Sequence, residues 1–306
     1  MIEPAATDIE VLVIGEALVD ITTTGEEILE TPGGGPANVA LGLGRRGIDV
    51  ALLTQLGPDA RGSAITRHLE RSGVWVLAES FGASPTSAAY AHILDDGSAR
   101  YEFHIDWTVS PERLLVKPRT VHAGSIAAFL APGDEVVLQQ IDQLAPEIVT
   151  FDPNIRPALV GDPGRARARF HEFARRSTVL KLSDEDAAFL YPGVDEAGIL
   201  TAIGDLGPRL VALTRGARGA VLAADGQVVE VPGRRVAVAD TIGAGDTFMA
   251  SLVADYPPLH VAELTEQHLR ILALRAVDAA AITVGRPGAD LPWAAELQAS
   301  AIAATP

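Results

Sequence analysis

Short apolar runs, each about the length of one β-strand, alternate along the chain with segments that have the periodicity of amphipathic helices. The runs are 11–14, 50–53, 120–123, 148–151, 179–182 and 210–213. Helical patterns lie between several of them, at 37–46, 60–72 and 163–176, and the part beyond residue 245 is largely helical, with 263–284 as its longest run. This alternation predicts an α/β fold with a mainly parallel central sheet and helices on both faces.

Composition places the chain among ordinary globular proteins. Its 306 residues, 48% hydrophobic and 21% charged, can bury a large core, and we expect a single domain spanning 1–306. No apolar run reaches the roughly 18 residues of a membrane span, and the first residues lack the basic region of a signal peptide, so we expect a cytoplasmic protein without a membrane partner. The absence of cysteine excludes disulfides, and the net charge of −16 argues against nucleic acid as a partner.

A second, smaller β-structure is expected outside this alternation. Residues 88–105 contain two strand-like segments around Asp95-Asp96-Gly97, and an Asp-Gly pair is typical of a hairpin turn. Residues 17–24 are also strand-like and directly follow the first core run. We expect these segments to form a small sheet that projects from the main domain, with a bare surface hairpin as the alternative.

The segment Asp240-Thr241-Ile242-Gly243-Ala244-Gly245-Asp246 places two carboxylates around a Gly-rich turn that opens onto an apolar helical run at 247–253. Glycines let the backbone approach a ligand closely, and the unpaired N–H groups at the start of a helix bind anions. A carboxylate such as Asp246 beside a bound phosphate is suited to be a general base that takes a proton from an attacking hydroxyl. The alternative is a loop in which Asp246 is an ordinary first-turn residue.

Two stretches at opposite ends of the chain resemble the signatures of one family. Residues 240–248, Asp-Thr-x-Gly-Ala-Gly-Asp-Thr-Phe, resemble the C-terminal signature of the ribokinase-like (PfkB) sugar kinases. Residues 32–40 and the later Leu56-Gly57-Pro58-Asp59 resemble its N-terminal signature, and the likeness extends from about Val11 to Trp293. The resemblance implies a ribokinase-like fold with a lid made of about 17–24 and 88–105. It also implies ATP and Mg²⁺ as cofactors, and it is compatible with a homodimer formed through the lid.

The resemblance assigns roles to the residues that match the family motifs. Asp246 would be the base for the sugar hydroxyl, and the backbone N–H groups of Gly243, Ala244 and Gly245 would hold the γ-phosphoryl group as charge builds on it. Asp20 resembles the family's acidic sugar ligand, because a carboxylate accepts hydrogen bonds from two adjacent hydroxyls. The other substrate-binding residues are expected to be Gly33, Gly34, Asn38 and Arg156. The nucleotide-binding residues are expected to be Asn154, Lys181, Ser183, Thr214 and Gly216.

The metal ligands are the point at which the chain departs from the family. Many members have Asn-x-x-Glu where this chain reads Ser183-Asp184-Glu185-Asp186. Asp186 matches that pattern by spacing and Glu185 by chemistry, so both stay candidates for organising Mg²⁺ and its waters. A monovalent cation such as K⁺ near Asp240 and the carbonyl of Ile242 is common in the family.

The identity of the sugar depends on three segments. Residues 15–20, 151–157 and 181–185 look more like bacterial fructokinases than ribokinases or adenosine kinases. We therefore expect ATP and D-fructose as substrates. A 2-keto-3-deoxygluconate kinase, in which Arg156 binds the substrate carboxylate bidentately, is the main alternative, beside other sugar or nucleoside kinases of the family. A regulator that binds a sugar or nucleoside without turnover is an alternative of another class, which Asp246 disfavours.

Two further patterns are interpreted as structural. Residues 42–47, Gly-Leu-Gly-Arg-Arg-Gly, match the Gly-x-Gly-x-x-Gly of dinucleotide-binding loops, but they follow a helical pattern and not a strand. We expect a helix that ends there at a glycine C-cap. The seven histidines show no metal-ligand spacing, and His122 and His260 are expected to be structural.

Overall fold

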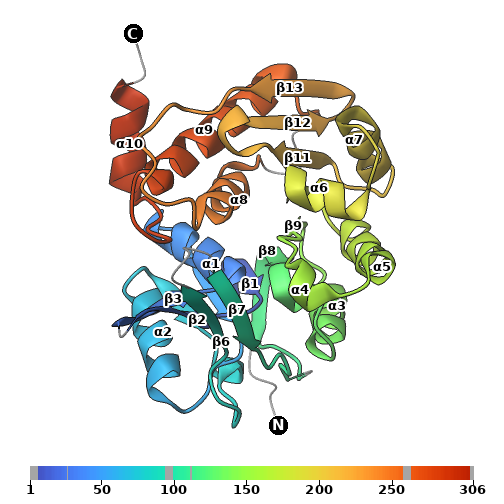
Figure 1. Cartoon of the computed structure of the whole chain (residues 1–306). Helices are drawn as coiled ribbons and strands as arrows, with labels where there is room; N and C mark the ends of the chain where they lie inside the picture. Colours follow the sequence, from blue (N-terminus) through green and yellow to red (C-terminus); the bar gives the residue numbers. More distant parts are fainter. Residues whose placement is uncertain (1–5, 26, 94–98, 111, 258–262, 304–306) are drawn as a thin grey trace.

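The computed structural model of the chain describes residues 6–25, 27–93, 99–110, 112–257 and 263–303. Its main sheet contains nine strands within these ranges: β1 Thr7–Ile14, β4 Val50–Leu53, β5 Val74–Val76, β8 Val116–Gly124, β9 Ile148–Asp152, β10 Val179–Ser183, β11 Leu210–Thr214, β12 Ala220–Ala224 and β13 Gln227–Val231. The strand order is β13-β12-β11-β10-β9-β8-β1-β4-β5. Figure 1 labels β13, β12, β11, β9, β8 and β1 of this sheet. The strands from β5 to β11 pair in parallel, while β12 and β13 add an antiparallel edge.

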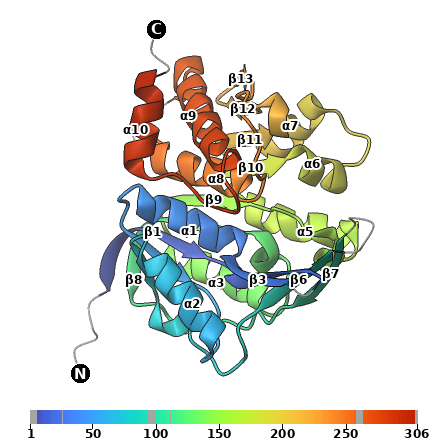
Figure 2. The same cartoon turned by 60° about the vertical axis from the view of Figure 1, so that its left-hand side comes forward.

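Helices cover both faces of this sheet (Figures 1 and 2). One face packs against α1 Gly35–Arg45, α2 Ala60–Glu70, α8 Ala244–Asp255 and α9 Glu266–Val284. The other packs against α3 Gly133–Leu144, α5 Pro163–Ala174, α6 Asp184–Leu190 and α7 Glu196–Gly204. Strand β1 shows the reason: Val11 and Val13 belong to the first cluster, and Leu12 and Ile14 to the second. A strand that is apolar on both sides is stable only between two helical layers, which confirms the predicted fold class.

The remaining helices connect these layers or follow them in the chain. They are α4 Pro157–Val160, α10 Ala294–Ala303 and the 3-10 helices η1 Ala78–Ser80, η2 Ser125–Ala128 and η3 Gly216–Arg218. In the described part of the chain, no helix is long and apolar enough to cross a membrane.

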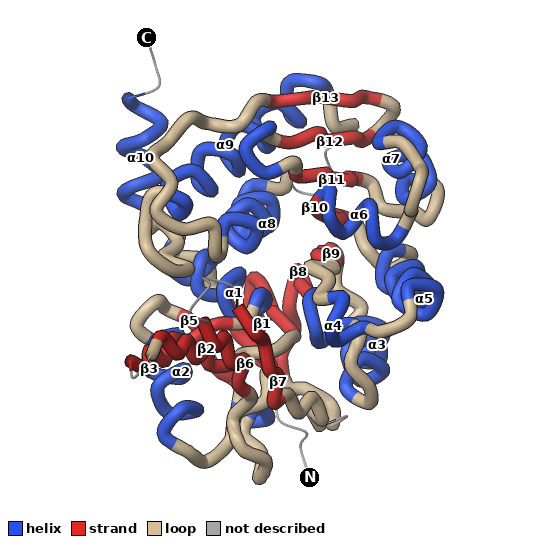
Figure 3. Tube along the Cα trace, in the orientation of Figure 1, coloured by secondary structure: helices blue, strands red, loops and turns tan. Residues whose placement is uncertain are grey.

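A separate four-stranded sheet lies to one side of the main sheet, beside α2 (Figure 3). Its strands are β2 Leu18–Thr24, β3 Glu27–Gly33, β6 Ala88–Ile93 and β7 Ala99–His104, in the order β3-β2-β6-β7. Strand β2 pairs in parallel with β6 and antiparallel with β3, and β6 pairs antiparallel with β7. The predicted strand at 17–24 and the two strands of the 88–105 hairpin are therefore present. The predicted turn at 95–97 lies outside the described residues, and β3 is an addition.

The segment 42–47 ends a helix, as predicted. Helix α1 ends at Arg45, and Gly47 has a φ of +80°. The N–H of Gly47 donates to the carbonyl of Gly44 at 2.9 Å, and the N–H of Ile48 donates to that of Leu43 at 3.2 Å. This pair of bonds is the Schellman motif, in which glycine adopts the left-handed conformation that other residues resist.

Candidate active site

A pocket of about 270 Å³ lies between the carboxyl ends of the parallel strands and the inner face of the four-stranded sheet. In open parallel sheets, ligands bind at this edge. Among the predicted site residues, those that line the pocket are Asp20, Gly34, Asn38, Asn154, Arg156, Ile242, Gly243, Gly245 and Asp246. Segments more than 200 residues apart therefore contribute to one site, as the two family signatures implied.

Asp246 lies in the first turn of α8 and is buried, with 8% of its surface exposed. The side-chain amide of Asn38, in the first turn of α1, donates to its Oδ2 at 2.8 Å. Burial raises the pKa of Asp246, while the Asn38 hydrogen bond and the charges of Lys181 and Arg156 oppose that rise. A carboxylate with a raised pKa is a stronger base than an exposed one, which suits proton abstraction from a hydroxyl.

Some N–H groups of the turn 241–245, called the cradle below, are already engaged within the protein. Gly243 is the N-cap of α8 with a φ of +79°, and a Cβ there would lie 2.8 Å from the Cβ of Ala289. The N–H of Ala244 donates to the carbonyl of Thr241 at 3.3 Å, which the sequence pattern did not indicate. Gly243 and Gly245 line the pocket, where the N-terminal end of the helix dipole favours negative charge.

A second helix also begins at the pocket. Gly34 is the N-cap of α1 with a φ of +106°, and a Cβ there would lie 2.5 Å from the carbonyl oxygen of Glu16. Any side chain at this position would push β3 away from the end of β1. The N-termini of α1 and α8 therefore both face the same cavity. The N-terminus of α1 lies beside the four-stranded sheet, and that of α8 follows the turn 241–245.

The opposite wall of the pocket carries Asp20 of β2 and Arg156. A Cβ at Gly33 would lie 2.1 Å from Oδ2 of Asp20, so the Gly33 backbone packs directly against that carboxylate. Asp20 is open to the cavity, yet the surrounding protein desolvates it and raises its pKa to about 6, with the charge of Arg156 opposing the rise. The Arg156 guanidinium is exposed and donates to Oδ1 of Asn154 at 2.7 Å.

Lys181 lies below the cradle and is almost fully buried. Its Nζ is 2.8 Å from Oδ2 of Asp152. A Cβ at Gly245 would lie 3.1 Å from the same Nζ. Burial acts to lower the pKa of Lys181, but Asp152, Asp186 and Asp246 outweigh burial and raise it. The ammonium group therefore keeps its positive charge directly beneath the start of α8. Asp152 has no role in the sequence-based prediction. Burial raises its pKa to about 6.

The candidate Mg²⁺ ligands differ in their freedom to bind. Oδ1 of Asp186 accepts the N–H of Ile155 at 2.7 Å, and Oδ2 accepts the N–H and hydroxyl of Ser183 at 2.9 and 2.7 Å. The bond from the Ser183 N–H forms a capping box at the start of α6 together with the Asp186 N–H, which donates to Oγ of Ser183 at 3.0 Å. With the Ile155 bond, both oxygens of Asp186 are engaged. Glu185 is exposed in the same helical turn. Within the described ranges, no group of three or more His, Asp or Glu side chains is arranged to hold a metal.

The remaining candidates lie at strand ends or in the loop before α8. Thr214 ends β11, and its hydroxyl donates to the carbonyl of Leu182 at 3.4 Å, while Gly216 is exposed with a φ of +54°. The carboxylate of Asp240 accepts the N–H groups of Ile242 at 3.0 Å and Gly288 at 2.9 Å. Burial acts to raise the pKa of Asp240, but these backbone donors lower it overall, so it stays anionic.

Glu16 is a pocket residue that sequence reasoning did not assign. It is 3% exposed, and its Oε2 accepts the N–H of Ala127 at 3.0 Å. Burial raises its pKa to about 7. The signal available was its place in the segment 15–20, directly after a buried strand.

His122 is buried and its Nδ1 lies 2.9 Å from the Thr150 hydroxyl, while His260 lies outside the described residues.

Comparison with known proteins identifies the family. The family described as pfkB family carbohydrate kinase matches residues 8–296. A fructokinase of Rhizobium leguminosarum bv. trifolii is 32% identical over 281 residues, with 85% of each chain covered. A crystal structure of a Vibrio cholerae fructokinase double mutant with fructose, ADP and potassium ion bound has a TM-score of 0.79 at 26% identity, over 97% of this chain and 99% of that one.

A second solved structure agrees with the first. An uncharacterized sugar kinase from Pyrococcus horikoshii in complex with ATP has a TM-score of 0.78 at 25% identity, over 94% of this chain and 96% of that one. These matches cover nearly the whole chain and include both motif regions, and they confirm the expected ribokinase-like fold. The chain belongs to the pfkB family of carbohydrate kinases.

Proposed function

We propose that the chain is an ATP-dependent fructokinase, which transfers the γ-phosphoryl group of ATP to a hydroxyl of D-fructose. The observation that carries this proposal is the buried Asp246 at the start of α8, held by Asn38 and facing Asp20 across one cavity. The fructokinases among the relatives support fructose as the sugar.

The proposed reaction uses the side chains and helix ends that line the pocket. Asp20 accepts hydrogen bonds from sugar hydroxyls and orients the ring. Asn38 occupies Oδ2 of Asp246, which leaves Oδ1 to accept the proton of the attacking hydroxyl. As charge builds on the transferred phosphoryl group, the N–H groups at the start of α8 and the buried ammonium of Lys181 stabilise it.

Nucleotide and cations are proposed to bind at the carboxyl ends of β9, β10 and β11, next to the pocket that Asn154 and Ile242 line. Asn154, Ser183, Thr214 and Gly216 would contact ATP from the strand ends. Glu185 would hold Mg²⁺ through the ion's waters, because both oxygens of Asp186 already accept hydrogen bonds. The bound ion would neutralise phosphate charge. A K⁺ site at Asp240 and the Ile242 carbonyl is supported by the anionic state of Asp240. The potassium ion in the V. cholerae fructokinase supports it as well.

Arg156 favours one second candidate function. Its exposed guanidinium lines the pocket, where it is able to bind a carboxylate bidentately. A 2-keto-3-deoxygluconate kinase would use Arg156 to bind the substrate carboxylate. In a fructokinase, the positive charge of Arg156 would instead oppose the rise in the pKa of Asp20 and Asp246.

An ADP-release assay separates these candidates. The panel contains fructose, ribose, adenosine and 2-keto-3-deoxygluconate, tested with the wild type, Asp246→Asn and the exposed control Asp142→Asn. We expect fructose-dependent ADP release that falls at least about 10³-fold in Asp246→Asn, with fructose binding kept in calorimetry and the control unchanged. Preference for the keto acid, lost in Arg156→Ala, would favour the second candidate. Sugar binding without turnover on any compound would contradict a kinase and indicate a regulator.

We also propose that two copies associate through the four-stranded sheet. Strand β3 is an edge strand of that sheet, and its Ile28 and Leu29 are 66% and 62% exposed. Light scattering of the wild type and of Ile28→Glu tests this proposal. A wild-type monomer at micromolar concentration would contradict it.

A further inference from the structure

Helices α1 and α8 run side by side, and both begin at the pocket (Figures 1 and 2). At their N-terminal ends, Asn38 donates to Asp246. At their C-terminal ends, Arg46 donates to Oδ1 of Asp255 at 2.7 Å and to the Ser251 hydroxyl at 3.1 Å. The two helices are therefore parallel and are joined by polar contacts at both ends.

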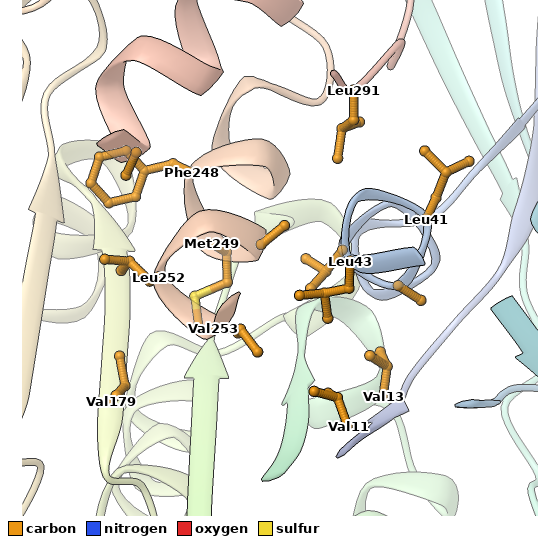
Figure 4. Close-up of a cluster of buried hydrophobic side chains, with 14 of the residues drawn as sticks. Val11, Val13, Leu41, Leu43, Val179, Phe248, Met249, Leu252, Val253 and Leu291 are labelled. Atoms are coloured by element: carbon orange, nitrogen blue, oxygen red, sulfur yellow. The ribbon is translucent and has the colours of Figure 1, made fainter. Parts of the chain in front are cut away.

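Between these ends the two helices are closely packed, with a glycine of α1 at the contact. A Cβ at Gly42 of α1 would lie 3.0 Å from the Cβ of Ala250 in α8 and 2.6 Å from Cδ2 of Leu291. Figure 4 shows Leu43 of α1 in one apolar cluster with Met249 of α8 and with Leu291. Real Cβ contacts are rarely so close, so a side chain at position 42 would separate the two helices.

Arg45 fixes the segment that covers this contact. Its Nη1 donates to Oδ1 of Asp290 at 2.7 Å and to the carbonyl of Leu291, and its guanidinium lies 5.1 Å from the centre of the Trp293 ring. Just before these residues, Ala289 packs against Gly243 in the cradle. Arg45 thus anchors the chain that supports the N-cap of α8.

Both arginines are too buried to be ordinary surface charges. The side chains of Arg45 and Arg46 are 10% and 17% exposed, and that of Asp255 is 13% exposed. Oδ2 of Asp255 is buried and has no hydrogen-bond partner among the described residues. Removing the Arg46 guanidinium would leave Asp255 with Arg275, at 3.7 Å, as its remaining ion-pair partner in the described chain. Leaving a buried charge short of partners is costly, so α8 would shift.

We propose that the segment 42–47 is a positioning device for the base, in which Arg46 and Arg45 hold α1 against α8 so that Asn38 meets Asp246. This inference rests on the proposed role of Asp246 as the base. Arg46 is eight residues from Asn38, or about 12 Å along a helix, so a change at one end of α1 moves the other end by a tilt or slide. A misplacement of about 1 Å in a catalytic contact costs about 100-fold in rate.

The test combines Arg46→Met with Asn38→Ala in a double-mutant cycle. We expect Arg46→Met to lower kcat about 10- to 100-fold, with the KM for ATP changed less than about 2-fold. The acid limb of the kcat profile should move to higher pH, because Asp246 loses the hydrogen bond that favours its ionised form. In the Asn38→Ala background, Arg46→Met should change kcat less than about 2-fold, because both changes remove the same contact.

Arg169→Met is the matched control, because it breaks another largely buried ion pair, with Asp134, between α5 and α3. It should lower the melting temperature and leave kcat and its pH profile unchanged. Equal losses of kcat from Arg46→Met in both backgrounds, or a lower melting temperature with an unchanged pH profile, would overturn the proposal.

If Arg46→Met does not fold, Asp255→Asn makes a milder change at the same contact, with the same expectations in the same cycle. A fully active Asp246→Asn would instead refute the proposed base. That outcome is measured separately from the cycle.

Discussion

Replacing Glu16 with glutamine measures how strongly the pocket disfavours a charged carboxylate. Glu16 is 3% exposed, and burial raises its pKa from 4.5 to about 7. A carboxyl group whose pKa rises on folding binds more protons in the folded state. It contributes the most stability below its unfolded pKa, and that contribution is lost as the pH rises through about 7.

The size of this effect follows from the gap between the two pKa values. At about 1.36 kcal/mol per pH unit, the gap between 4.5 and about 7 corresponds to a loss of about 3.4 kcal/mol at alkaline pH. About 2.5 kcal/mol of that loss falls between about pH 5 and pH 8. Glutamine keeps the acceptor for the Ala127 N–H and stays neutral at every pH, so Glu16→Gln does not lose this contribution.

Urea unfolding of the wild type and Glu16→Gln at several values between about pH 5 and pH 8 gives the difference directly. The stability advantage of the variant should grow by about 2.5 kcal/mol across that range. Asp20 and Asp152, whose pKa values are also raised, titrate in both proteins and cancel in the comparison. Glu10→Gln, at an exposed position of β1, should run parallel to the wild type. If the stability of Glu16→Gln changes with pH in the same way as that of the wild type, the reasoning is refuted.

Three further predictions concern the site and its support. Asp20→Asn should raise the KM for fructose about 10- to 100-fold and leave the KM for ATP nearly unchanged in steady-state assays, because a hydrogen bond to a charged acceptor is lost. Gly243→Ala should lower kcat at least about 10-fold, since φ is +79° and the new Cβ meets Ala289; wild-type kcat would contradict the fit. Asp59→Ala should cost about 2 kcal/mol in urea unfolding with kcat unchanged, because the carboxylate caps α2 and accepts two hydrogen bonds from Thr86.

Burial explains only some of the strands that sequence reasoning missed. The six predicted runs all form strands of the main sheet, because helices cover both sides of it and leave nearly continuous apolar sequence. Strands β3 and β13 are edge strands with mostly exposed residues, so they carry no apolar run to detect. Strand β12 was also missed, although its sequence, Ala-Val-Leu-Ala-Ala, is apolar and mostly buried. Helix α7 was missed for another reason: it is short, and its sequence has little contrast between its two faces.

The site residues that sequence reasoning found lie in local motifs, and those that it missed depend on contacts between distant parts of the chain. Residues within the two motif regions, such as Asn38 and Asp246, were assigned to the site because these regions resemble the family signatures, in which glycine-rich turns and helix starts leave a local pattern. The pairing of Lys181 with Asp152 joins neighbouring strands 29 residues apart, and no local pattern specifies it. The roles of Arg45 and Arg46 were hidden for the same reason, because their partners lie more than 200 residues away.

The charge composition gave no hint of an anion-binding site, and the structure explains why. The chain carries 40 acidic against 24 basic residues, and Glu16, Asp20 and Asp246 all line the pocket. Two helix N-termini supply positive potential there through backbone N–H groups, which add nothing to the net charge. Side chains contribute only where the fold brings them in, as with Lys181 below the cradle. Because a backbone donor carries no titratable charge, this arrangement would let an acidic chain hold phosphate beside the proposed carboxylate base.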